Sequence, residues 1–332
     1  MNGDNPRPNL PDSLESLLPE VSRSFFLSLR FLPEPLRPPL SLAYLLARTS
    51  DSLADEAAAP MALRLQALQN FSGAITSCET LSLHQKFPAL RLSQPAEQRL
   101  VEHSELLLAE LAQLPENQRR QIQWLLQIIT AAQALDLTRF GYACAQHPSA
   151  LRTRQDLQAY TYAVAGCVGE FWTRLCSLTL PNWPEAHQAT LLEHGRLFGQ
   201  GLQLVNILRD LPEDLAAGRC YLPADDLESL GLQPANLREN ASTARPLILQ
   251  WIEQAHTWLQ HGAQYERLIP GIRLRFSVSL PRRIGLKTLA ALRAHPPLET
   301  TARVKITRSE VLQCALQSIG AALRHEWFTS KR

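Results

Sequence analysis

Apolar residues recur every three or four positions along most of this chain, which is the spacing of a buried helix face. The pattern predicts helices over residues 13–18, 40–58, 60–76, 96–113, 116–145, 156–180, 183–214, 243–266 and 308–327. Strands do not alternate with these helices, so we expect one all-α domain over residues 13–330. The polar, proline-rich residues 1–12 are expected to form a disordered lead-in.

One segment departs from the helical pattern. Residues 272–280 alternate apolar and polar side chains with a period of two, which is typical of a half-buried strand. An isolated strand would have no partner in an otherwise helical chain. We therefore predict a helix here, with a strand as the alternative.

Composition sets the class of protein. The 332 residues are 45% hydrophobic, which is enough for a sizeable core. The 33 Lys and Arg residues against 31 Asp and Glu give a net charge of +2, so charge does not indicate nucleic-acid binding. No uninterrupted apolar stretch of membrane-spanning length and no signal-peptide pattern is present. We expect a cytoplasmic protein, with contact to a membrane surface still open.

The cysteines are expected to be buried free thiols in a reducing compartment. None forms a C-x-x-C pair, and most have apolar neighbours, so a zinc site is not expected. They are Cys78, Cys144, Cys167, Cys176, Cys220 and Cys314.

Two pairs of aspartates carry the candidate chemistry. Asp51 and Asp55 are four residues apart, as are Asp210 and Asp214. On a helix this spacing stacks both carboxylates on one face, where they repel each other unless a cation lies between them. A single pair is more often a solvated surface. Two pairs predict Mg²⁺, which binds oxygen ligands and is shared with substrate phosphates.

Cationic and aromatic residues near these pairs favour a diphosphate substrate. Arg48 precedes the first pair and Arg209 the second, and an arginine beside carboxylates is useful when the ligand brings its own negative charge. Apolar helix walls and aromatic faces would shelter a carbocation formed when an allylic diphosphate ionises. The aromatic candidates are Tyr44, Tyr160 and Tyr162, with Phe25 and Phe26 lining the hydrocarbon tail.

Two local features remain open at this stage. Pro212 lies inside the second aspartate pair, where it either kinks a helix or marks its end near Asp210. Small residues follow Tyr162 at three- and four-residue spacing, which indicates close packing of a helix or of a ligand. Val164 and Gly169 of that stretch are expected to line the substrate pocket.

Four ordered motifs resemble the squalene/phytoene synthase family: SRSFF at 22–26, YLLARTSDSLADE at 44–56, YTYAVAGCVGE at 160–170 and QLVNILRDLPEDLAAGRCYLP at 203–223. The resemblance implies an all-α isoprenoid-synthase bundle around a central apolar cavity. It also implies a head-to-head prenyltransferase that joins two prenyl diphosphates with Mg²⁺.

The same resemblance assigns roles to individual residues. Asp51, Asp55, Asp210 and Asp214 match the family's metal-binding aspartates. The family's diphosphate-contacting residues correspond to Ser22, Arg23, Arg48, Arg209 and Arg219 of this chain. The polar residues that line the family's site correspond to Gln203 and Asn206. Tyr44, Tyr160 and Tyr162 are the catalytic candidates. Ala163 stands where eukaryotic-type enzymes have a catalytic tyrosine, so Tyr160 and Tyr162 compete for the acid/base role.

The C-terminal part indicates which branch of the family to expect. The stretch Arg303–Arg308 is similar to a basic segment that contacts NADPH phosphate in squalene-forming members, which makes Lys305 and Arg308 candidate NADPH contacts together with Asn206. We therefore expect two farnesyl diphosphates to be converted, through presqualene diphosphate and reduction by NADPH, into squalene by a monomer. The alternatives are phytoene, dehydrosqualene or presqualene diphosphate as product, and a non-catalytic helical assembly factor.

Overall fold

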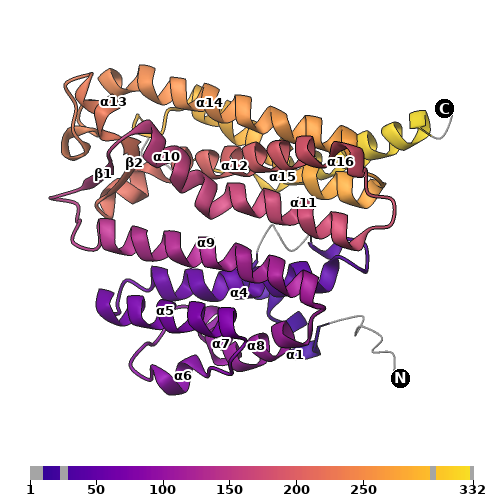
Figure 1. Ribbon diagram of the computed structural model, residues 1–332. Helices are drawn as coiled ribbons and strands as arrows, with labels where there is room; N and C mark the ends of the chain where they lie inside the picture. Colours follow the sequence, from indigo (N-terminus) through magenta and orange to yellow (C-terminus); the bar gives the residue numbers. More distant parts are fainter. Residues whose placement is uncertain (1–9, 23–28, 300–303, 330–332) are drawn as a thin grey trace, which may run out of the picture. The chain divides into compact units, whose positions relative to one another are not determined.

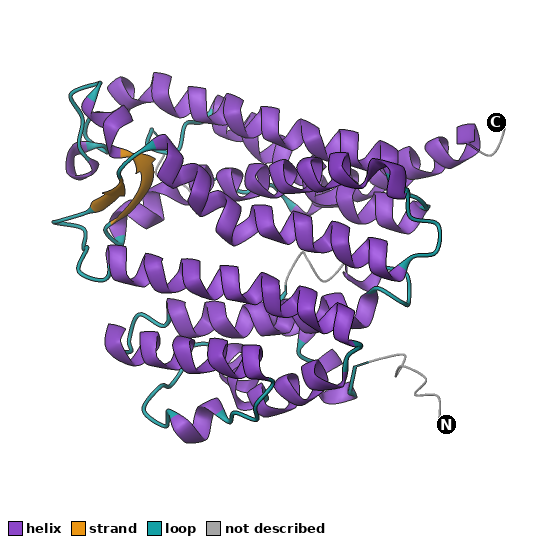
Figure 2. Ribbon diagram, viewed as in Figure 1, coloured by secondary structure: helices purple, strands orange, loops and turns teal. Residues whose placement is uncertain are grey.

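Helices make up nearly all of the regular structure, which confirms the predicted all-α fold (Figures 1 and 2). The computed structural model describes residues 10–22, 29–299 and 304–329. The described chain divides into two compact units, one formed by residues up to 138 with 174–183 and the other by 139–173 with residues from 184 on. The prediction of a single domain stays a prediction, and most of the predicted lead-in lies outside the described residues.

The first part of the chain is a bundle of helices. These are α1 (Asp12–Glu15), α2 (Leu18–Val21), α4 (Arg37–Asp55), α5 (Met61–Ser77), α6 (Leu83–Lys86), α7 (Pro95–Glu102), α8 (Ser104–Gln113) and α9 (Glu116–Phe140). The apolar stripe of α4 is fully buried at Leu42, Leu45, Leu46 and Leu53, as its spacing predicts. The helix predicted over residues 96–113 is interrupted at His103 and forms α7 and α8.

The later part contains longer helices and one pair of strands. Its elements are β1 (Ser149–Leu151), α10 (Arg154–Thr161), the π-helix η1 (Tyr162–Gly166), α11 (Cys167–Thr179), η2 (Glu185–His187), α12 (Gln188–Ala216), β2 (Arg219–Pro223), α13 (Ala224–Glu228), η3 (Pro234–Asn236), α14 (Ala241–Leu268), α15 (Ile272–Ala294) and α16 (Arg308–Thr329). None of the described helices is both long and apolar enough to cross a membrane.

A capping box fixes the beginning of α10. The Thr153 hydroxyl accepts a hydrogen bond from the Asp156 backbone N–H (3.1 Å), and the Asp156 carboxylate accepts one from the Thr153 backbone N–H (2.9 Å). These bonds satisfy donors that a helix start leaves unpaired. Hydrogen bonds from the Thr153 backbone and side chain also lower the pKa of Asp156. The helix thus begins two residues before the predicted start.

The small residues after Tyr162 allow two helices to approach closely. A Cβ atom on Gly169 would lie 1.9 Å from the backbone oxygen of Gly195 on α12, and one on Gly199 would lie 2.3 Å from that of Ala165. Only glycine fits at such a contact. Close helix packing is therefore sufficient to explain Gly169, and its predicted place in a substrate pocket stays a prediction.

Residues 272–280 form the first turns of α15, which confirms the predicted helix and makes the strand alternative wrong. Arg273 in the first turn is exposed, but the other three polar members of the alternation, Arg275, Ser277 and Ser279, are as buried as their apolar neighbours. Arg275 donates from Nε to the carbonyl of Ile269 (3.0 Å), and Ser277 donates to that of Arg273 (3.0 Å). Their polarity therefore does not mark a solvent-facing side.

Two short strands were not predicted. β1 and β2 pair in parallel, with Ser149 opposite Arg219 and Ala150 opposite Cys220, and the Ser149 N–H donates to the carbonyl of Gly218 (2.9 Å) (Figure 2). A three-residue strand is too short to produce a recognisable alternation. The pair positions Arg219 directly after the end of α12.

All six cysteines are free thiols. Four are buried, Cys78 is half-buried and Cys144 is exposed, so the predicted burial is confirmed for most of them.

Candidate active site

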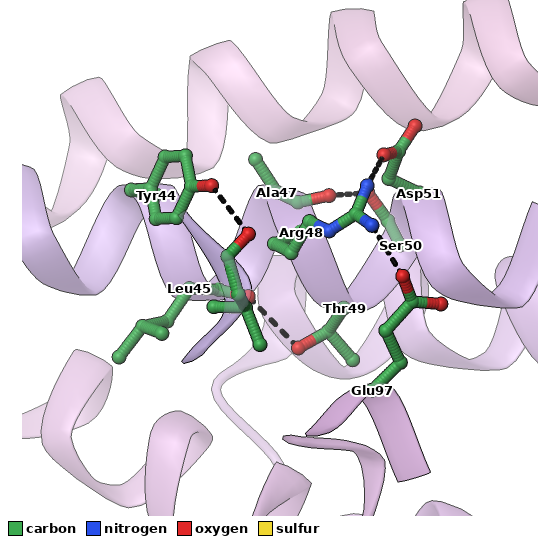
Figure 3. A network of polar contacts seen from close by, with 9 residues as sticks. Tyr44, Leu45, Ala47, Arg48, Thr49, Ser50, Asp51 and Glu97 are labelled. Atoms are coloured by element: carbon green, nitrogen blue, oxygen red, sulfur yellow. Dashed lines mark hydrogen bonds and ion pairs between the residues drawn. The ribbon is translucent and has the colours of Figure 1, made fainter. Parts of the chain in front are cut away.

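The first carboxylate pair lies on the last two turns of α4. Figure 3 shows Asp51 of this pair with its polar contacts. The Arg48 guanidinium forms ion pairs with Asp51 on the same helix and with Glu97 on α7. The Tyr44 hydroxyl, one turn before Arg48, donates to the carbonyl of Val21 (3.0 Å). Asp55, at the end of the helix, is exposed. One face of α4 therefore carries Tyr44, Arg48, Asp51 and Asp55 at spacings of four, three and four residues.

The charges around Asp51 oppose its ionisation. Loss of solvation and the neighbouring Asp55 carboxylate raise the pKa of Asp51 to about 6, although Arg48 acts in the other direction. Its side chain keeps 42% exposure, so a ligand can reach it. A cation bound here would relieve the repulsion between the two carboxylates.

Glu97 is the residue of this site that the sequence did not indicate. It is 49 positions from Arg48 in the chain, and its side chain is 20% exposed. Because no spacing rule joins residues on two separate helices, only the fold brings it to Arg48.

The second pair lies near the end of α12. Arg209 binds Asp210 through two hydrogen bonds, from Nε (2.8 Å) and Nη2 (2.6 Å), and Arg219 donates from Nη2 to Asp214 (3.0 Å). Burial raises the pKa of Asp214 against the opposing effect of Arg219, and the charge of Asp210 adds to the increase. Each aspartate of this pair thus has its own arginine.

Pro212 does not end the helix. α12 continues through it to Ala216, so the alternative of a helix that stops near Asp210 is wrong. The carbonyl of Pro212 accepts a hydrogen bond from Nη2 of Arg238 (2.6 Å). Both aspartates consequently belong to one helix, as their spacing requires for a shared face.

The other predicted residues belong to three parts of the chain. Asn206 donates from Nδ2 to Oε1 of Gln203 (3.4 Å) one turn before Asp210. Val164 is half-buried in the π-helix. Lys305 and Arg308 are exposed, in the segment that leads into α16 and in its first residue.

The two competing tyrosines have different surroundings. The Tyr160 ring stacks on the Tyr221 ring, with centroids 4.6 Å apart. The Tyr162 hydroxyl donates a long hydrogen bond to Glu170 (3.5 Å), whose other oxygen lies 4.0 Å from Nε of Arg196. Tyr162 also begins the π-helix, a feature that often occurs at functional sites. The Tyr162 hydroxyl therefore lies beside a carboxylate that can accept its proton.

The N-terminal motif is only partly described. Ser22 is buried and its hydroxyl donates to the carbonyl of Leu18. Arg23, Phe25 and Phe26 lie outside the described residues, so their predicted roles stay predictions.

The residues present suit Mg²⁺ bound together with a diphosphate. Both aspartate pairs offer only carboxylate oxygens, which are ligands that this ion prefers. Within the described residues no group of three or more His, Cys, Asp or Glu side chains gathers at one point. A metal bound at either pair would therefore complete its coordination with water or phosphate oxygens. Nε of Arg48 is buried with no hydrogen-bond partner in the described chain, and is available as an additional donor.

Comparison with known protein families gives one match over most of the chain. The model of the squalene/phytoene synthase family matches residues 18–310. The matched span includes both aspartate pairs, the π-helix and the basic segment before α16.

Individual relatives include proteins with different products. A phytoene synthase of Mycobacterium tuberculosis is 25% identical over 93% of this chain and 90% of its own. A squalene synthase of Schizosaccharomyces pombe is 25% identical over 94% of this chain and 66% of its own. The match covers only 15% to 50% of the length of several other relatives, some of them bifunctional.

Solved structures agree on the fold. A ligand complex of TcSQS has a TM-score of 0.76 at 20% identity and covers 95% of this chain and 91% of its own. The squalene synthase HpnC of Alicyclobacillus acidocaldarius has a TM-score of 0.61 at 23% identity, over 85% and 92% of the two chains. At these identities the likeness establishes the isoprenoid-synthase architecture and leaves the reaction product undetermined.

Proposed function

Because this chain belongs to the squalene/phytoene synthase family, whose members are prenyltransferases, we propose that it converts two farnesyl diphosphates into squalene. The first step is a head-to-head condensation to presqualene diphosphate with loss of one diphosphate. The second releases the remaining diphosphate and transfers a hydride from NADPH. Mg²⁺ is the proposed metal, and the cytoplasm the proposed location of a monomeric enzyme.

The observation that carries the proposal is the pairing of candidate metal-binding aspartates with arginines. Arg48 holds Asp51, Arg209 holds Asp210 and Arg219 holds Asp214. The aspartates would hold Mg²⁺, and the arginines would then be available for the charge of a diphosphate. A departing diphosphate would thus be stabilised by metal and guanidinium together.

The proposed acid/base is Tyr162. Its hydroxyl has Glu170 as an acceptor, and a phenol beside a carboxylate can pass a proton to or from a nearby group. Tyr160 is the second candidate, since its ring stacks on Tyr221 and can present an aromatic face to a cationic intermediate. Tyr44 is held by Val21 and is proposed to position the Arg48 turn of α4.

The proposed NADPH contacts are two exposed cationic residues and one polar residue. Lys305 and Arg308 present charges suited to the phosphate of NADPH, and Asn206 is the proposed polar contact. The proposal of squalene rather than phytoene depends on this basic segment, which resembles that of squalene-forming members.

Product analysis tests the proposal. Purified protein is incubated with farnesyl diphosphate and Mg²⁺, with and without NADPH, and the lipids are identified by mass spectrometry. Squalene with NADPH, and presqualene diphosphate without it, are expected. Phytoene from geranylgeranyl diphosphate, or a product unaffected by NADPH, would assign the chain to another branch. No turnover of any prenyl diphosphate would instead favour a helical assembly factor.

A further inference from the structure

Two histidines on neighbouring helices face each other outside the residues proposed for catalysis. Nδ1 of His194 on α12 lies 3.0 Å from Nδ1 of His261 on α14, and the two ring centroids are 5.1 Å apart. Both residues are half-buried. His194 precedes Asp210 on the same helix by more than four turns, which is about 24 Å at the rise of an α-helix. This histidine pair is therefore separate from the second aspartate pair.

Close packing of α12 against α14 fixes the separation of the two side chains (Figure 1). A Cβ atom on Gly201 of α12 would lie 2.9 Å from the backbone nitrogen of Leu259 on α14. A Cβ atom on Gly262, the residue after His261, would lie 2.7 Å from the ring of Phe198 on α12. Only glycine permits such an approach. The two helices are thus in direct contact beside the histidine pair.

A buried hydrogen bond also holds α14 in position along its axis. The Tyr265 hydroxyl, one turn after His261, lies 2.9 Å from the Thr173 hydroxyl of α11. Thr173 packs beside Gly195, the residue after His194, where a Cβ atom would lie 3.0 Å from its Oγ1. Both histidines are therefore attached to helix positions that their surroundings fix. Such preorganisation lowers the cost of ordering the two rings around a ligand.

The distance between the two ring nitrogens suits a shared metal ion. Nitrogens bound about 2.0–2.1 Å from one ion, at angles of about 90–110°, lie about 2.8–3.4 Å apart. The observed 3.0 Å falls in this range. A hydrogen bond from one Nδ1 to the other gives a similar distance and describes the metal-free pair. A metal would replace the shared proton once the donating ring carries its proton on Nε2 instead, so the rings need little movement.

The chemistry of the ligands and the nearby charges select the kind of ion. Imidazole nitrogen favours Zn²⁺, Ni²⁺ and Cu²⁺, whereas Mg²⁺ prefers the oxygens of the aspartate pairs. Arg282 packs against Gly262, but its charge is paired with Glu266 (3.2 Å). Glu193, the exposed residue before His194, adds a carboxylate next to the pair. A divalent cation with a preference for nitrogen is therefore the complementary ligand.

We propose that His194 and His261 together bind one divalent transition-metal ion such as Zn²⁺ or Ni²⁺, and that the bound ion links α12 to α14. Because the protein supplies two ligands, water completes the coordination and the ion exchanges with the solvent. Half burial of both residues leaves room for that water. The site does not depend on which prenyl product the protein forms.

Titration calorimetry tests the site. Untagged full-length protein, freed of metals with a chelator that is then removed, is titrated with NiCl₂ or ZnCl₂ in the presence of excess Mg²⁺, which competes for the carboxylates. One ion is expected to bind at the histidine pair. H194Q and H261Q should each weaken this binding at least about tenfold, because chelation by two rings is lost. Ni²⁺ should also raise the thermal midpoint of the parent more than that of either variant, since only the folded chain brings the two rings together.

The matched control is H256Q, also on α14. The His256 ring contacts Glu253 (3.7 Å) and Gln260 (3.1 Å) of its own helix, so its loss should leave binding at the pair unchanged. Circular dichroism checks that all three variants are folded.

Three results would overturn the proposal. Equal Ni²⁺ and Zn²⁺ affinity in the parent, H194Q and H261Q would leave the pair as a hydrogen bond only. Loss of binding in just one of these two variants would mean that a single ring holds the ion. Loss in H256Q alone would place the ion elsewhere on α14. Because the titration needs no prenyl substrate, its outcome is independent of the product analysis.

Discussion

The Arg48 guanidinium is paired with Glu97, a carboxylate on a different helix that no sequence motif indicated. The pair is half-buried, with 28% and 20% of the two side chains exposed. This pair would hold Arg48 in place when Asp51 exchanges its arginine for a metal. We therefore infer that Glu97 is a positioning residue for the first aspartate pair.

Replacing Glu97 by Gln should weaken this arrangement. Without its second carboxylate, Arg48 is held by Asp51 alone and competes more strongly with Mg²⁺ for that side chain. We expect kcat/KM to fall about tenfold, the equivalent of one charge-assisted hydrogen bond, with a rise in the Mg²⁺ concentration needed for half-maximal rate. The control is E105Q on α8, an exposed position. An unchanged Mg²⁺ requirement in E97Q would contradict the positioning role.

Asp51→Asn and Asp210→Asn should remove turnover without unfolding the protein. Loss of a metal-binding carboxylate is expected to lower kcat/KM by at least about a hundredfold. Because the pKa of Asp51 is raised in the folded chain, its charged form opposes folding at neutral pH. The thermal midpoint of D51N should therefore equal or exceed that of the parent. D225N, at an aspartate paired with Arg152, serves as control. Retained activity in D51N would refute the metal assignment.

The two tyrosines can be separated by removing one hydroxyl at a time. Tyr162→Phe removes the group that contacts Glu170, and kcat should fall about a hundredfold if it transfers a proton. Tyr160→Phe keeps the ring that stacks on Tyr221 and should change kcat much less. The pH dependence of kcat in E170Q provides a second measurement, because the acceptor of the Tyr162 hydroxyl has changed. A larger loss in Y160F than in Y162F would reverse the assignment.

Two glycine substitutions of identical chemistry should have opposite effects on stability. Gly169→Ala forces a methyl group against the backbone of Gly195 and should lower the free energy of unfolding by about 2 kcal/mol or more. Gly73→Ala, inside α5, meets nothing within 4 Å and should raise it by about 0.5–1 kcal/mol through helix propensity. Urea denaturation measures both. Equal effects would mean that α11 and α12 can move apart.

A histidine pair predicts loss of stability in mild acid. Nδ1 of His194 on α12 lies 3.0 Å from Nδ1 of His261 on α14. Burial and the charge of His261 lower the pKa of His194, against the opposing effect of Glu193. Folding thus favours neutral His194, and its contribution is present above the ordinary histidine pKa and decreases as pH falls below about 6.5. The urea midpoint of H194Q should depend less on pH over this range. An identical pH dependence in parent and variant would rule out the pair as the cause.

Helices with one apolar stripe were predictable from sequence, and their ends were less so. The spacing of the leucines in α4 predicted both the helix and the face that it buries. The polar positions of α15 produced a strand-like alternation although the segment is a helix. Arg275 and Ser277 are buried there because their side chains donate to backbone carbonyls. The π-helix at Tyr162 and the break at His103 depend on tertiary contacts that local spacing does not encode.

The candidate site divides in the same way. Residues within one helix turn, such as Asp210 and Asp214, could be associated by spacing alone. Glu97 could not, because its partner belongs to another helix. The arginine of Asp214 is a third case: Arg219 was found by resemblance, but its position on a strand was not.

The β1–β2 pair makes the second aspartate pair depend on a distant part of the chain. Ser149 holds the strand that carries Arg219, and Gly218, with φ of +83°, fits only because it has no side chain against Cys144. We therefore expect segments 144–151 and 206–223 to be exchangeable between relatives only together. If residues 206–223 of a relative were grafted into this protein without the matching 144–151 segment, the strand that carries Arg219 would pair with a strand from a different protein. A chimera that transfers both segments together keeps the arginine and the carboxylate in register.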